Sequence, residues 1–227
     1  MTRIGFGLLA ALLVLGGAAI AYRMADGPSP AAPRAEANRP VLALLTSLPL
    51  LFGEQFSIEG GGSPALARIE QRYKVEPIAV ADGASLKNHR LLLMAHPRAQ
   101  PAEVLVELDA WVRAGGRLVL LADPRLEWES SRPLGDPLRP PPAFADTGLL
   151  AHWGLALAEA EAGEGAFRLT DNQCSLDQRS LIARCMIGKG RATIFADVDF
   201  VMRANDDNPE KHRFDLLMEE LARFDPR

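Results

Sequence analysis

Several sequence marks of common enzyme classes are missing from this chain. It has no Gly-x-Ser-x-Gly nucleophile elbow, no phosphate-binding loop and no Gly-x-Gly-x-x-Gly dinucleotide fingerprint. Its two cysteines lack the spacing of a metal site, and so do its four histidines, His89, His96, His152 and His212. The net charge of −4 argues against general affinity for nucleic acids. These absences predict a protein that is not an enzyme, has no cofactor and does not bind nucleic acid.

A long uncharged run lies near the amino terminus. Ile4 to Ala21 is apolar over eighteen residues, which is long enough to span a bilayer as a helix. The run also ends in Ala19-Ile20-Ala21, a small-x-small sequence typical of signal-peptide cleavage sites. Residues 1–24 are therefore predicted to be either a transmembrane anchor or a signal segment. The signal-like layout predicts export. We expect a single-pass protein of a bacterial inner membrane with its C-terminal domain in the periplasm, or a periplasmic protein released by cleavage.

Residues 25–40 are predicted to be a linker. This stretch is rich in proline and alanine and holds almost no large apolar side chain, so it cannot bury enough surface to offset the entropy of ordering. The remaining residues, 41–227, are enough for one domain, and the 48% hydrophobic content of the chain suffices for one substantial core.

The clearest local pattern lies between residues 91 and 124. Leu91 to Ala95 and Arg117 to Ala122 are short apolar runs, typical of strands buried on both faces. Between them, apolar residues recur at helical spacing, namely Val104, Leu105, Leu108, Trp111 and Val112. The Gly115-Gly116 pair ends this helix, since glycine can adopt the left-handed conformation that caps the last turn. The pattern predicts a βαβ unit with parallel strands.

Similar patterns predict elements on both sides of this unit. We expect strands at 41–45, 75–80, 167–169, 181–187 and 192–196, and helices at 65–73, around 147–153 and from 209 to 224. The strands at 167–169 and 181–187 are expected to form an antiparallel excursion. The alternation of strands and helices predicts an α/β, three-layer sandwich with a mainly parallel, flavodoxin-like sheet, preceded by the N-terminal transmembrane or signal helix.

Two cysteines, Cys174 and Cys185, flank a turn-like segment. In an exported domain this spacing suits a disulfide across a hairpin. Two separate buried thiols are the alternative, and the sequence does not decide between them.

Polar residues follow the ends of the predicted strands. Ligands bind outside the carboxyl ends of the strands in an open parallel sheet. The candidate ligand-binding residues at this edge are Thr46, Ser47, His96, Asp123, Arg125, Asp197 and Asp199. The three carboxylates suit a divalent cation, and Arg125 suits an anionic group. The structural alternative is that the aspartates accept hydrogen bonds from loop amides, as aspartate often does after a strand.

Two segments carry a family resemblance. AWVRAGGRLVLLADP at 110–124 and GKGRATIFADVDF at 188–200, with a closing Asn-Pro helix, resemble the GldG-like auxiliary component of uncharacterised ABC-type transport systems. The resemblance covers most of the chain from Val41 to Phe224, and Gly188, Gly190, Asp197 and Asp199 look like the family's turn and strand end. It implies a class I glutamine-amidotransferase-like fold. The catalytic cysteine is absent, because Asp123-Pro124 follows the strand at 117–122.

The resemblance and the predicted address imply a function. We expect a non-catalytic, membrane-anchored periplasmic domain that serves as an accessory or ligand-sensing part of an ABC-type transport system. Its partners would be the permease or ATPase subunits, besides the membrane. The alternative is a metal-dependent hydrolase that uses the carboxylates at the ends of the strands. Neither the ligand nor the transported substrate can be named from the sequence.

Overall fold

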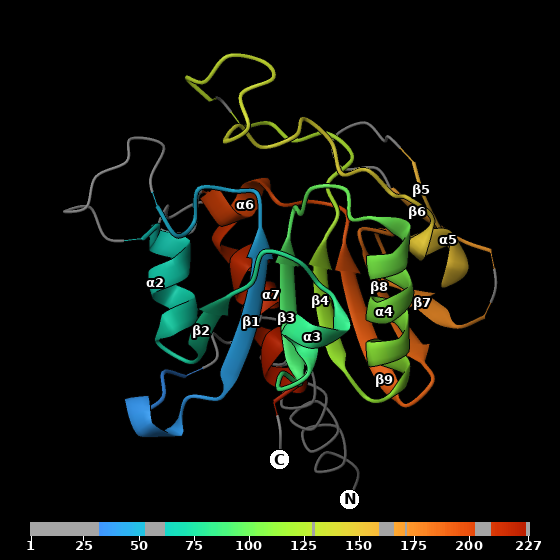
Figure 1. Ribbon diagram of the computed structural model, residues 1–227, viewed down its shortest axis with the longest axis horizontal. Coiled ribbons are helices and arrows are strands. Elements are labelled where there is room, and N and C mark those ends of the chain that lie inside the picture. The colour runs from blue at the N-terminus through green and yellow to red at the C-terminus, as the bar shows by residue number, and fades with distance from the viewer. Residues whose placement is uncertain are drawn as a thin grey trace, which may run out of the picture.

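A seven-stranded sheet with helices on both faces forms most of the structure (Figure 1). The computed structural model describes residues 32–52, 62–128, 130–158, 166–170, 172–202 and 210–225. In spatial order the strands of the sheet are β2 (Lys74–Pro77), β1 (Val41–Thr46), β3 (Leu91–Ala95), β4 (Arg117–Leu121), β9 (Gly190–Phe195), β8 (Ile182–Ile187) and β7 (Cys174–Leu176). A separate pair is formed by β5 (Leu155–Leu157) and β6 (Phe167–Leu169). The helices are η1 (Glu36–Asn38), α2 (Pro64–Glu70), α3 (Gly83–Leu86), α4 (Ala102–Arg113), α5 (Leu149–His152), α6 (Asp199–Met202) and α7 (Glu210–Arg223).

The sheet corrects the predicted fold class. The strands from β2 to β9 in the spatial order are parallel, but β8 pairs antiparallel with both β9 and β7, so the sheet is mixed. The physical reason is the tight turn at 188–189, which joins β8 to β9 as a hairpin and leaves no room for a parallel crossover. The expected pairing of 167–169 with 181–187 is also wrong, because β6 pairs with β5.

The predicted N-terminal helix is not supported, because residues 1–31 lie outside the described residues. The expected start of the last helix, at Asn208 and Pro209, lies outside them too. Among the residues that are described, no helix is both long and apolar enough to cross a bilayer. The end of the predicted linker packs on the domain. The Arg34 guanidinium pairs with the carboxylate of Asp225 at 2.5 Å, and Lys74 donates its backbone N–H to Pro40 at 2.9 Å.

Alternation along the buried strands divides the core between the two faces of the sheet. On β3, Leu92 and Met94 pack with α4, whereas Leu91 and Leu93 pack with α7. All five residues of β3 are buried, as expected for a parallel strand covered on both sides. Burying one such leucine contributes about 1.5–3 kcal/mol, so β3 and its neighbours form the rigid centre of the domain.

The turn after α4 interlocks with the turn before β9. Lys189 donates its backbone N–H to Arg113 at 2.9 Å. Gly188 has a φ of 59°, and a Cβ atom on Gly190 would lie 1.9 Å from the carbonyl oxygen of Val112. Only glycine fits at these two positions. The interlock aligns the strands that follow the two turns, so their far ends also lie together, and Ala122 donates its N–H to Phe195 at 2.7 Å.

Cys174 and Cys185 lie opposite each other on β7 and β8 and form a disulfide between them. Both residues are buried. The disulfide joins the two antiparallel strands at one side of the sheet, away from the carboxyl ends of β4 and β9.

Candidate functional site

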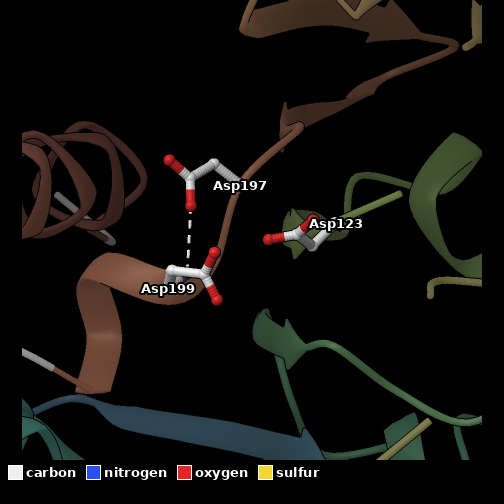
Figure 2. Close-up of side chains that lie close together, drawn as sticks. All are labelled: Asp123, Asp197 and Asp199. Atoms are coloured by element: carbon white, nitrogen blue, oxygen red, sulfur yellow. Dashed lines mark hydrogen bonds between the residues drawn. The ribbon is translucent and has the colours of Figure 1, made fainter. Parts of the chain in front are cut away.

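Three aspartates meet where β4 and β9 end. Asp123 comes two residues after β4, Asp197 comes two residues after β9, and Asp199 begins α6. Because β4 and β9 are parallel neighbours, their carboxyl ends lie side by side. Ligand oxygens from the three carboxylates all lie within 4.8 Å of one another. Figure 2 shows Asp123 reaching the other two from a separate strand.

Asp123 is the buried member of this carboxylate cluster, with 4% of its surface exposed. One oxygen accepts the backbone N–H of Arg125 at 2.8 Å, and the other accepts that of Val198 at 2.9 Å. Burial raises the pKa of Asp123 to about 7, and the negative charges of Asp199 and Asp197 act in the same direction. The two N–H groups oppose that increase. Asp123 therefore changes its charge near neutral pH.

The other two aspartates are held by the loops around them. Asp197 accepts the N–H of Asp199 at 2.9 Å and forms an ion pair with Arg213 of α7. Asp199 accepts the N–H of Glu127 at 3.0 Å, which ties α6 to the loop after β4. Sequence reasoning missed Arg213, because no local signal links a helix residue to a strand end sixteen positions earlier.

The geometry of the cluster suits a divalent cation. Ca²⁺ lies about 2.3–2.6 Å from its oxygens, so ligands on opposite sides of the ion are about 4.6–5.2 Å apart. Mg²⁺ lies about 2.0–2.1 Å from its oxygens. The backbone N–H bonds do not prevent coordination, because each carboxylate oxygen has two acceptor sites. Three oxygens within 4.8 Å of one another can surround either ion, and Ca²⁺ is favoured because it tolerates flexible coordination, whereas Mg²⁺ demands near-ideal octahedral geometry and dehydrates reluctantly.

Three other predicted site residues, Thr46, Ser47 and Arg125, use their side chains in contacts outside the cluster. Thr46 donates its hydroxyl to the carbonyl oxygen of Ala95 at 2.9 Å, and Ser47 donates to that of His96. These bonds join the ends of β1 and β3 and explain both hydroxyls structurally. The guanidinium of Arg125 is exposed and pairs with Glu127 at 3.3 Å.

His96 occupies a sharp turn directly after β3, with a φ of 47°. It is fully buried, its Nε2 donates to the carbonyl oxygen of Pro141 at 2.8 Å, and burial lowers its pKa. Its Nδ1 has no hydrogen-bond partner among the described residues. The chain thus makes a sharp turn at His96, directly after β3. The position that the sequence suggested for a nucleophile turn, Asp123-Pro124, follows the next strand, β4.

A loop and a cavity surround the cluster. The segment after β4 crosses above the carboxyl ends of the strands (Figure 1), and Phe144 donates its N–H to the carbonyl oxygen of Asp123 at 2.7 Å. On the side of α7, a cavity of about 580 Å³ is lined by Asp197, Arg213 and Arg179 over an apolar floor that includes Phe200. The cluster is thus covered on one side and open to a cavity on another.

Comparison with known proteins identifies no family. No protein-family model matches the chain, and no curated protein matches it. Similar solved structures include an exo-β-1,4-mannosidase from Opitutaceae bacterium strain TAV5, with 11% identity and a TM-score of 0.45 over 82% of this chain and 36% of the other. A β-galactosidase from Rahnella sp. R3 has 14% identity and a TM-score of 0.40, over 83% of this chain and 32% of the other. A β-galactosidase from Bacillus circulans sp. alkalophilus has 13% identity and a TM-score of 0.36, over 75% of this chain and 30% of the other. The chain spans about a third of the length of these proteins.

Two predictions are withdrawn. The flavodoxin-like or amidotransferase-like assignment is not supported, because the sheet is mixed and no family model matches the chain. The prediction that the chain is not an enzyme is withdrawn as well, because a cluster of three carboxylates can support metal-assisted catalysis. Likeness at these TM-scores assigns no activity to this chain, so its function has to be argued from its own residues.

Proposed function

We propose that this protein is a ligand-sensing domain of an ABC-type transport system, anchored on the periplasmic side of a bacterial inner membrane, and that it binds a divalent cation at Asp123, Asp197 and Asp199. The observation that carries the cation site is the convergence of three carboxylates within 4.8 Å. The anchor is supported by the apolar run from Ile4 to Ala21. The link to transport is supported by the resemblance of 110–124 and 188–200 to the GldG-like family.

The contacts of the cluster supply a route for sensing. Asp197 is shared, since it pairs with Arg213 of α7 and also faces the position of the cation. A bound cation competes with the guanidinium for this carboxylate and weakens the ion pair. Asp199 meanwhile holds the backbone of Glu127 in the loop after β4. Cation binding therefore shifts the preferred positions of α7 and of that loop, which are the surfaces a transporter subunit would read.

A second candidate function is favoured by one observation, the pKa of about 7 at Asp123. A carboxylate that exchanges its proton near neutral pH can act as a general base, and a cation beside it would lower the pKa of a bound water. The second candidate is therefore a metal-dependent hydrolase that uses the same three residues. Turnover of phosphoester, amide or glycan substrates that is abolished by chelators and by Asp123→Asn would establish it.

The cation site is tested by calorimetric titration of the full chain in detergent micelles with Ca²⁺ and with Mg²⁺. We expect one Ca²⁺ site, tighter than the Mg²⁺ site, that is lost in the variant Asp123→Asn/Asp197→Asn/Asp199→Asn. Asparagine keeps one acceptor oxygen, so positions 197 and 199 retain their N–H bonds, whereas position 123 loses one of its two, and circular dichroism checks that the variant stays folded.

The control variant is Asp82→Asn/Asp136→Asn/Asp146→Asn. These aspartates also accept backbone N–H bonds, at 2.8, 2.7 and 3.1 Å, but lie outside the cluster. Unchanged Ca²⁺ binding in this control supports the proposal. Wild-type protein that binds no cation, or equal loss in both variants, contradicts it.

The address and the partners need separate tests. Alkaline phosphatase fused after Arg227 is expected to be active, because that enzyme works only when it is exported. Full-length protein extracted from membranes is expected to co-purify with permease or ATPase subunits. An inactive fusion together with an active cytoplasmic reporter at the same position would overturn the exported address, without bearing on the cation site.

A further inference from the structure

The opposite end of the sheet carries a strongly basic cavity that the carboxylate cluster does not explain. Arg90 directly precedes β3, Arg117 begins β4, and Arg191 lies at the start of β9. In the sheet register, Arg117 is the direct partner of Arg191 and also of Leu91. Lys189 from the glycine turn and Arg223 from the end of α7 join these three around a cavity of about 600 Å³. The only carboxylate among its described lining residues is Asp225.

Asp225 cannot neutralise this cavity, because it is already engaged. Its carboxylate pairs with Arg34 at 2.5 Å and with Arg72 at 2.7 Å, and it accepts the Tyr73 hydroxyl at 2.9 Å. Two of the lining cations also have partners. Arg117 donates to the carbonyl oxygens of Phe224 and Asp225, and Arg223 donates to Glu220 at 2.8 Å.

Three of the lining cations have no partner among the described residues. The side chains of Arg90, Lys189 and Arg191 are exposed and make no ion pair or hydrogen bond within the part of the chain that the structure describes. Adjacent strands lie about 4.7–4.9 Å apart, and like charges on neighbouring strands repel. The chain therefore holds several positive charges against their mutual repulsion, and a bound anion would relieve it.

We propose that this basic edge, defined by Arg90, Arg117, Lys189, Arg191 and Arg223, binds a phosphate-bearing anion, and that its source is the headgroup of an anionic lipid. Guanidinium groups donate paired hydrogen bonds to phosphate, and the lysine adds a point charge.

The position of the edge favours a lipid. The beginning of β1 and the end of α7 lie at this same end of the sheet (Figure 1), and Arg34 is paired with Asp225 of the cavity. Only residues 22–33 separate Arg34 from the apolar run, and they span at most about 40 Å when fully extended. The lipid source thus rests on the anchoring proposed above, whereas the phosphate chemistry does not.

The test uses the full chain in nonionic detergent micelles at constant ionic strength. It is titrated with inorganic pyrophosphate and, in a separate arm, with short-chain phosphatidylglycerol, and phosphatidylcholine serves as the zwitterionic comparison. The variant is Arg90→Gln/Lys189→Gln/Arg191→Gln. The control, Lys74→Gln/Lys87→Gln/Arg168→Gln, removes the same number of positive charges from exposed positions outside the cavity.

We expect wild type and control to bind both ligands equally well, and the variant to bind them about 100-fold more weakly. Binding of pyrophosphate without phosphatidylglycerol would overturn the lipid source and support the phosphate site. No binding of either ligand to wild type, or equal weakening in variant and control, would overturn the proposal. Recovery of the full chain without detergent would contradict the anchor instead, and the pyrophosphate arm would still test the site.

Discussion

The two ends of β4 and β9 carry opposite charges on one rigid frame. At the carboxyl ends, Asp123 and Asp197 are held by backbone N–H groups and lie under a loop. At the amino ends, Arg117 and Arg191 stand beside glycine turns, and Arg191 is exposed. The same strand spacing brings like charges together at both ends. What differs is the surrounding: Asp123 is buried and both aspartates are fixed by hydrogen bonds, whereas Arg191 reaches into solvent.

This difference predicts two kinds of binding. Fixed carboxylates, one of them buried, discriminate between cations by size, because their oxygens cannot follow a smaller ion at no cost. Exposed cations on long side chains adapt to many phosphates, and salt screens them strongly. Cation binding at the carboxyl ends is therefore expected to be selective. Phosphate binding at the amino ends is expected to accept many ligands and to weaken as ionic strength rises.

The largest expected effect comes from breaking the frame itself with Gly190→Ala. Its Cβ would meet the Val112 carbonyl oxygen at 1.9 Å, so the two turns must separate. We expect the free energy of unfolding to fall by about 3 kcal/mol, measured by chemical denaturation. The control is Gly83→Ala, whose Cβ would meet only the end of the Glu107 side chain, at 3.2 Å. Its effect should stay within about 1 kcal/mol, and an equal loss would contradict the interlock.

A somewhat smaller loss is expected from removing the disulfide, which belongs to neither end. Cys174→Ala/Cys185→Ala should lower the free energy of unfolding by about 2–3 kcal/mol, because the disulfide restricts the unfolded chain and its short loop keeps this effect modest. Affinity for Ca²⁺ and for pyrophosphate should not change. Thiol labelling of wild-type protein should require reductant, and full labelling without it would show free thiols.

Asp123 predicts a pH dependence that belongs to the carboxyl end alone. Its folded pKa of about 7 lies above its ordinary value of 3.8, so the folded state holds the proton more tightly than the unfolded state. Its contribution to stability is fully present below about pH 4 and is lost as pH rises through 7. Between pH 6 and 8 the loss is about 1 kcal/mol.

Thermal unfolding at several pH values checks this. Asp123→Asn should flatten the profile in that window, and Asp146→Asn should not. Ca²⁺ should bind more tightly as pH rises, because it displaces the proton. An unchanged slope in Asp123→Asn would contradict the shifted pKa.

Substitutions at one end of the strands are expected to have no effect on ligand binding at the other end. The triple asparagine variant of the carboxylate cluster should bind pyrophosphate like wild type. The triple glutamine variant of the basic edge should bind Ca²⁺ like wild type. Distant sites without shared partners behave additively, so a change of more than about 0.5 kcal/mol in either affinity would show that the frame couples them.

Sequence reasoning succeeded where a long buried pattern determines the local structure. Leu91–Ala95 is β3 as expected, and the helix beside it carries the expected apolar face. It failed for short elements such as β5 and α3, whose few residues cannot outweigh tertiary contacts. The pairing of β6 with β5 was missed because it depends on those same contacts.

The site divides in a similar way. Asp123 and Asp197 were placed correctly at strand ends, since parallel strands align those ends. The contacts of Arg125 and His96 depend on loop geometry that no periodicity reveals. The basic edge was missed for another reason, because the rule for open parallel sheets predicts ligands only at the carboxyl ends of the strands. An arginine beside each of three apolar runs was readable in the sequence.

The central claim is that Asp123, Asp197 and Asp199 hold one divalent cation. Mn²⁺ shares their preference for oxygen ligands and gives an anomalous X-ray signal. In crystals grown with Mn²⁺, we expect one strong anomalous peak within bonding distance of all three carboxylates, absent from crystals of the triple asparagine variant. Crystals of wild-type protein with no peak between these carboxylates at saturating Mn²⁺ would contradict it.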